Sequence, residues 1–175
     1  PDSKWIVYDV RSDAAGSLFD GTRIERVQIE TLQVEVLFES KKDACCGVVT
    51  YSPMNEQVVF IHGPEHPTED WRYGPFHRQG VIVATDRPGI ATPLDARNLV
   101  EPFTEGALRG GSHVHVFHPG ARWVSFTYED HVLASRPSES GIDLNQRNVG
   151  VCKLGRSVTV PRNHPRNHDG TGFSF

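Results

Sequence analysis

The sequence predicts an all-β chain built from about three β-propeller blades, and three observations support this. A short motif opens at Pro1, Pro53 and Pro119: a proline turn, then a strand with an aromatic residue at its fourth position. Segments with period-two alternation, such as residues 33–38, are typical of half-buried antiparallel strands. No segment carries an apolar stripe at helical spacing over three turns.

Each unit contains further strands after the motif. A second strand is expected at residues 26–29, 80–83 and 148–151, and a third is clear only at residues 33–38. The blade units run roughly over residues 1–43, 44–108 and 109–175. A repeat of several short strands joined by Gly- and Pro-rich turns favours propeller blades over a β-sandwich, since Greek-key strands do not predict matching blade openings.

The chain is expected to be a fragment of a larger propeller. It begins at Pro1, inside the first repeat, and ends at Phe175, in what resembles the start of another unit. A closed propeller typically needs about four to eight blades, and sequence for about three is present. The missing blades would then cover the edges of the ones seen here.

Composition indicates a globular protein without a nucleic-acid or membrane partner. Hydrophobic residues make up 37% and charged residues 23%, and the net charge of −4 provides no basic patch for nucleic acid. No apolar run reaches the length of a membrane span. Cys45, Cys46 and Cys152 form an odd set without zinc spacing, which favours buried free thiols in the cytoplasm. Periplasmic export stays open, because the true N-terminus is expected to be missing.

Residues 109–119 contain the principal candidate site. His113 and His115 are two apart in an extended, β-branched stretch behind Gly110 and Gly111, so both rings are expected on one face. Neutral imidazoles bind Zn²⁺ or Mn²⁺, and His62, at the end of the strand in the second repeat, is the expected third ligand or a base. The alternative is a strand whose histidines are simply hydrogen-bonded to their neighbours.

Other polar residues have both functional and structural interpretations. Arg109 can hold a carboxylate in a bidentate fork, or form a surface ion pair. The acidic segment that contains Glu65 and Trp71 can cap a sugar site, or be a long connection between strands. The remaining candidates are left without an assigned role: His77, His131, His164 and His168.

Residues 52–65 and 108–117 closely resemble an uncharacterised bacterial family of TolB-like propeller proteins. More distantly, the chain is similar to the oligogalacturonate lyases, which are seven-bladed propellers with a histidine-ligated divalent metal, usually manganese. The lyase strand that ends Phe-Cys-His-Glu-Gly-Pro is similar to residues 60–64 here, and the metal-ligand histidine before a Ser-Pro-Asp-Gly turn is similar to His115 or His113.

This resemblance implies a metal-dependent lyase that acts on oligouronides. In such a β-elimination a metal or an arginine neutralises the substrate carboxylate and a base removes the adjacent proton. The implied roles are metal ligation by His113, His115 and His62, carboxylate binding by Arg109, and His62 as an alternative base. Two alternatives stay open: a non-catalytic TolB-like scaffold that binds a protein or peptide, and metal-dependent hydrolysis of a small ester or phosphate.

Overall fold

The computed structural model describes residues 3–136 and 144–175, so Pro1 and Asp2 of the first repeat lie outside the described residues. Within this part of the chain the secondary structure is almost entirely β, with a single four-residue helix, α1 (His131–Ala134). The all-β prediction is therefore confirmed. No helix in these two ranges is long and apolar enough to cross a membrane.

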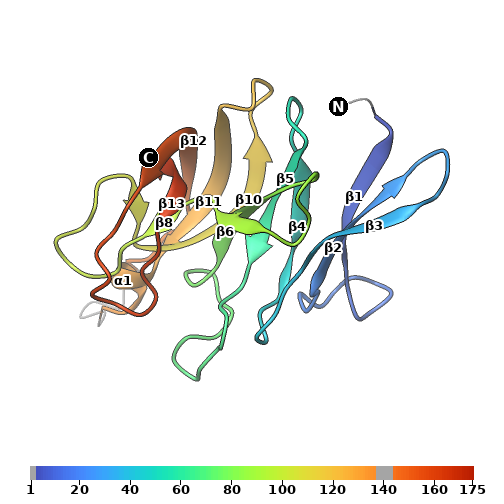
Figure 1. Ribbon diagram of the computed structural model, residues 1–175. Helices are drawn as coiled ribbons and strands as arrows, with labels where there is room; N and C mark the ends of the chain where they lie inside the picture. Colours follow the sequence, from blue (N-terminus) through green and yellow to red (C-terminus); the bar gives the residue numbers. More distant parts are fainter. Residues whose placement is uncertain (1–2, 137–143) are drawn as a thin grey trace.

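The strands form three antiparallel sheets in chain order, each a meander in which consecutive strands pair. Figure 1 shows the three sheets standing side by side. The first sheet contains β1 (Trp5–Val10), β2 (Arg23–Gln28) and β3 (Val34–Glu39). The second contains β4 (Cys46–Tyr51), β5 (Gln57–His62), β6 (Gln79–Ala84) and β7 (Ala91–Pro93). The third contains β10 (Gly110–Phe117), β11 (Trp123–Asp130), β12 (Asn148–Val158) and β13 (Gly170–Ser174). A short parallel pair, β8 (Ala96–Arg97) and β9 (Ala107–Leu108), links the second and third sheets.

The sequence repeat has a structural counterpart. β1, β5 and β11 begin at Trp5, Gln57 and Trp123, which are equivalent positions of the motif. The other predicted strands overlap β2, β6, β12 and β3, so these elements are confirmed. β5 and β11 are second in their sheets, whereas β1 is first in its sheet. The connections after β1 and β5, together with α1 after β11, lie along the lower edge in Figure 1.

Two apolar cores separate the three sheets. β5 is buried along nearly its whole length, and its side chains alternate between the cores. Val58 and Phe60 pack with Ile24 of the first sheet, while Val59 packs with Phe126 of the third. The middle sheet is therefore covered on both faces, which explains why β5 reads as a continuous apolar run.

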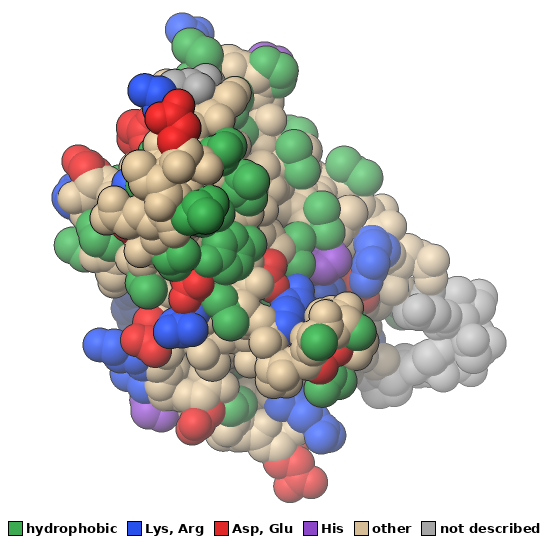
Figure 2. Space-filling view, turned by 90° about the vertical axis from the view of Figure 1, so that its right-hand side faces the viewer, with side chains coloured by type: hydrophobic (Ala, Val, Ile, Leu, Met, Phe, Trp, Pro, Cys, Tyr) green, Lys and Arg blue, Asp and Glu red, His purple; other side chains and the backbone are tan. Residues whose placement is uncertain are grey.

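The outward-facing sides of the first and third sheets are apolar but exposed. Ile6, Val34 and Val36 of the first sheet are 54%, 51% and 44% exposed. Figure 2, viewed from the side where β1–β3 lie, shows apolar side chains gathered on this face. On the third sheet, Val116 and Val151 lie opposite Ser125 and are likewise exposed. Both ends of the row thus present surfaces suited to further sheet packing.

Candidate functional site

A β-bulge in β10 places His113 and His115 on opposite faces of the strand. The pairing with β11 shifts between His113 and Val116, and Val114 inside the bulge has φ of 54°. The His115 ring bonds to Ser112, which precedes His113 and therefore points to the other face from it. The prediction that the two imidazoles converge on one ion is wrong, because the bulge breaks the period-two alternation.

His115 belongs to a fully buried polar network. Its Nε2 lies 2.9 Å from Ser112 Oγ, and that hydroxyl donates to Asp95 Oδ1 at 2.8 Å. The Gly80 amide donates to both oxygens. Because the serine proton is committed to Asp95, we assign the His115 proton to Nε2, which leaves Nδ1 without a partner in the core. Burial lowers the pKa of His115 to about 3, so the ring is neutral.

Replacing Ser112 with alanine is expected to lower the free energy of unfolding by about 1–3 kcal/mol, because Gly80, Asp95 and His115 each lose a partner in a site closed to water. Urea unfolding measures the change. Ser125→Ala on the neighbouring strand is the matched control, since its exposed hydroxyl makes only a 3.4 Å contact. Equal losses in the two variants would contradict the role assigned to the network.

The glycine pair at the start of β10 is explained by close packing. A Cβ on Gly110 would lie 2.1 Å from Glu129 O, and one on Gly111 would lie 2.4 Å from Pro75 O and 2.8 Å from the Phe76 carbonyl carbon. The first contact is within the third sheet, and the second is with the connection that leads into β6. The pair therefore lets that connection lie directly on β10, next to His113.

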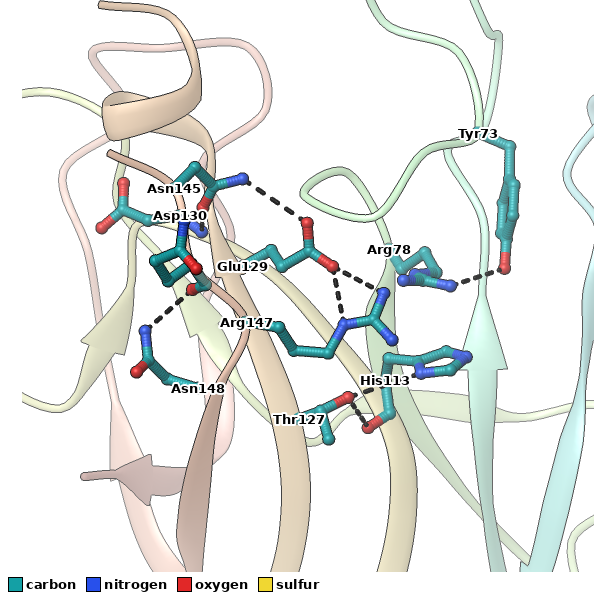
Figure 3. Close-up of polar contacts among 10 residues, drawn as sticks. Tyr73, Arg78, His113, Thr127, Glu129, Asp130, Asn145, Arg147 and Asn148 are labelled. Carbon is teal, nitrogen blue, oxygen red and sulfur yellow. Dashed lines mark hydrogen bonds and ion pairs between the residues drawn. The ribbon is translucent and has the colours of Figure 1, made fainter. Parts of the chain in front are cut away.

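His113 lies in a polar cluster between the second and third sheets. Figure 3 shows its ring close to Arg78, which precedes β6, and to Arg147, which precedes β12. Burial, followed by the charges of Arg78 and Arg147, lowers the pKa of His113 to about 4, while Glu129 opposes the shift. The imidazole is therefore neutral at pH 7.

Thr127 determines the tautomer of His113. The threonine hydroxyl donates to the His113 carbonyl at 3.2 Å, so its oxygen is left to accept from Nδ1–H of the ring at 3.4 Å. We assign the proton to Nδ1 on this basis. Nε2 then carries a free electron pair, which is the arrangement that a general base requires.

Arg78 is a buried cation without an acidic partner among the described residues. The residue is only 7% exposed. Its guanidinium contacts the Tyr73 hydroxyl at 3.3 Å and lies over the Tyr73 ring, while its Nε is buried with no hydrogen-bond partner. An unpaired buried charge costs several kcal/mol. The geometry therefore favours an anion beside Arg78.

Arg147 already has its counter-ion. Glu129 Oε1 accepts from its Nε at 2.8 Å and from its Nη2 at 2.6 Å. Asn145 lies on the side of the Glu129 carboxylate away from Arg147, with its Nδ2 3.5 Å from Oε2 (Figure 3). The uncompensated charge of the cluster is therefore that of Arg78. Neither Arg78 nor Arg147 was predicted from the sequence.

His62 and Arg109 lie in other surroundings. His62 lines a hollow between the first two sheets together with Lys42 and Gln79, and burial lowers its pKa. Arg109 forms an ion pair with the nearly buried carboxylate of Asp130, which is the structural alternative left open for this arginine. The four predicted site residues are thus not brought together.

The predicted metal site does not fit this arrangement. Across residues 3–136 and 144–175, no three His, Cys, Asp or Glu side chains form a group able to hold a metal ion. His115 is enclosed in the core and His113 lies on the opposite face of β10. Binding of Mn²⁺ or Zn²⁺ stays a prediction that elemental analysis of the purified protein can test.

The fold and the cluster define an all-β protein of successive antiparallel meanders, with a polar cluster around a buried arginine between two of them. The model of the family "Protein of unknown function (DUF3748)" matches residues 45–168, and the chain belongs to this family. "Uncharacterized protein YidR" of Escherichia coli (strain K12) is 48% identical over 171 residues, which is 98% of this chain and 39% of the relative. The predicted membership of an uncharacterised bacterial family is thereby confirmed. The chain spans about two fifths of the length of this relative.

Proposed function

We propose that the three sheets are consecutive blades of a TolB-like β-propeller. Each is a meander of the same strand order, and the repeated motif occupies the same strand in the second and third sheets. The sheets pack face to face through apolar cores. The exposed apolar faces at both ends of the row, including Ile6 and Val151, fit this arrangement, since neighbouring blades cover such faces.

We further propose that the cluster of Arg78, His113 and Tyr73 binds the carboxylate of a small acidic saccharide. The observation that carries this proposal is the buried guanidinium of Arg78, which has no acid to compensate it in the described chain. Arginine holds carboxylates through planar paired hydrogen bonds. The distant resemblance to oligogalacturonate lyases favours a uronate as the acid.

The proposed reaction is β-elimination, as in the predicted lyase. His113 Nε2 takes the proton next to the carboxylate, and the electrons of that C–H bond form the new double bond. The neighbouring C–O bond breaks, and its oxygen leaves with the proton that the His113 imidazolium then returns, which regenerates the base. Arg78 stabilises the negative charge that develops on the carboxylate. A bound anion also raises the pKa of His113 from about 4 toward neutrality, which improves it as a base.

Trigalacturonate is the first probe of this proposal. Arg78→Met is expected to raise its dissociation constant about a hundredfold, because loss of a buried charged contact costs about 2–5 kcal/mol. His113→Gln is expected to retain binding but lose formation of unsaturated uronate, followed by ultraviolet absorbance. Calorimetry measures the binding.

Arg87→Met is the matched control, because Arg87 is an exposed arginine on the turn after β6. Arg78→Lys keeps a charge at the site and separates binding from misfolding, which circular dichroism monitors. Trigalacturonate binding that is equal in wild type and Arg78→Met, with both proteins folded, would remove the basis for the anion site. Binding without unsaturated product would leave a binding protein and exclude the lyase.

The second candidate function is a non-catalytic scaffold for a protein or peptide. The apolar faces that include Val34, Val36 and Val151 favour it, because exposed apolar patches often mark interaction sites. Failure of every uronide to bind, together with capture of a defined partner lost on Val36→Lys, would support this function instead. A cytoplasmic location accords with three free cysteines and stays part of the proposal.

A further inference from the structure

A hollow of about 400 Å³ lies between the first two sheets, away from His113. Phe38 of β3, Val81 of β6 and Pro93 of β7 form its apolar lining. A smaller hollow of about 200 Å³ adjoins it and shares His62, Glu65, Gln79 and Pro93. A cavity of this size falls in the roughly 300–1,000 Å³ range of small-molecule sites.

Two polar side chains stand next to each other in this hollow. His62 and Gln79 are direct partners across β5 and β6, so their side chains lie on one face about 5 Å apart at Cβ. His62 is 6% exposed, and burial keeps its imidazole neutral by lowering its pKa, against the opposing influence of Glu65 and the Gly63 backbone. The Gln79 amide has no hydrogen bond to any described residue. The pair offers both donors and acceptors, with no charge.

The formal charges on the lining of the larger hollow cancel. Lys42 is paired with Glu65 at 2.7 Å, and Lys41 stands with Glu39 on the same lining. This balance contrasts with the uncompensated charge of Arg78 in the His113 cluster. A carboxylate or phosphate gains no net attraction here, whereas a neutral ligand rich in hydroxyl groups can use every polar group present.

The smaller hollow is bordered by the segment that contains Glu65 and Trp71, where the Trp71 ring is buried and stacked on His77. Arg166 holds the rim by donating to the backbone oxygens of Glu65 and His66 at 2.8 and 3.1 Å, and its guanidinium lies over Trp71. The rings of Phe38 and Pro93 are apolar, and the Gln79 amide and His62 imidazole beside them are polar. This combination matches the two faces of a sugar ring, one of C–H groups and one of hydroxyls.

We propose that this hollow is a binding site for a neutral sugar unit, with Gln79 and His62 as its hydrogen-bonding groups and Phe38 and Pro93 as its apolar lining. Consecutive residues of extended chain point to opposite sides, so Gln79 faces this hollow while Arg78 faces the cluster of Tyr73 and His113. The site therefore does not depend on the function proposed above.

Saturation-transfer NMR with galactose, glucose and N-acetylglucosamine tests the proposal. At least one sugar is expected to bind, and Gln79→Ala is expected to weaken it about tenfold through lost hydrogen bonds. Gln33→Ala, at an exposed glutamine before β3, is the control and should leave binding unchanged. Gln79→Glu keeps the size of the side chain and changes only its charge and its hydrogen-bond donors. It therefore tests the polar role of Gln79 separately from its size.

Two results would overturn the site. One is the absence of saturation transfer from all three sugars to folded wild-type protein. The other is sugar binding that survives Gln79→Ala unchanged. Competition separates the two proposed sites: galacturonate should not displace the neutral sugar, and displacement at a single shared site would also overturn the proposal.

Discussion

Gly111→Ala is expected to destabilise the protein by more than about 3 kcal/mol and to abolish its cooperative unfolding transition at moderate temperature. The new methyl carbon would lie 2.4 Å from Pro75 O and 2.8 Å from the Phe76 carbonyl carbon. Both atoms are backbone, so neither can rotate away. Relief requires the connection before β6 to leave β10, which also separates Arg78 from His113.

Gly120→Ala is the control for this prediction. Gly120 is exposed on the turn between β10 and β11, where a Cβ would meet only the His118 ring, at 3.3 Å. Thermal unfolding of the two variants gives the comparison. If Gly111→Ala unfolds within a few degrees of Gly120→Ala, the close approach of the loop to β10 is not present in solution.

The strands were predictable because their signals are local. A proline turn and period-two alternation are properties of neighbouring residues, and they placed β5 and β11 correctly. The glycine pair is visible in the sequence, but its physical reason, the approach of Pro75 and Phe76, comes from a distant segment. Local sequence patterns therefore predict the strands but not the distant segments that pack on them.

The bulge is the main reason why the sequence alone wrongly predicts the His113 and His115 rings on one face of the strand. Val114 adopts φ of 54°, a conformation that a β-branched residue rarely takes. The residue types at positions 110–117 therefore do not indicate a bulge. Tertiary packing imposes it by placing both Ser112 and His115 in the core. Because of this one extra residue in β10, the His113 side chain lies on the face of the strand opposite His115.

Arg78 is a site residue that the sequence does not predict. Its importance comes from burial and from the lack of an acidic neighbour, and neither property can be read from the residues around it. Arg109 is predicted to bind a carboxylate because it lies near the histidine pair in the sequence, yet the fold pairs it with Asp130. The sequence signal that remains is an arginine directly before a buried strand, β6.

Acidification is expected to unfold this protein well before its carboxylates are fully protonated. Four histidines have pKa values lowered to about 4 or about 3, chiefly by burial: His77, His113, His115 and His168. In the unfolded chain a histidine takes up its proton near pH 6.5. Between that pH and the folded values the unfolded state binds more protons, so the free energy of unfolding falls as pH falls.

Each such histidine contributes a slope on the order of 1.4 kcal/mol per pH unit below pH 6.5, and the full stability is present above it. Burial raises the pKa of Asp95, which acts in the opposite direction, but it is one group against four. Urea unfolding between about pH 7.5 and 4.5 measures the slope. His115→Gln removes one buried imidazole and should flatten it by one proton. A free energy of unfolding that stays constant across this window would show that these rings are hydrated and titrate freely. That result would contradict the burial of these histidines.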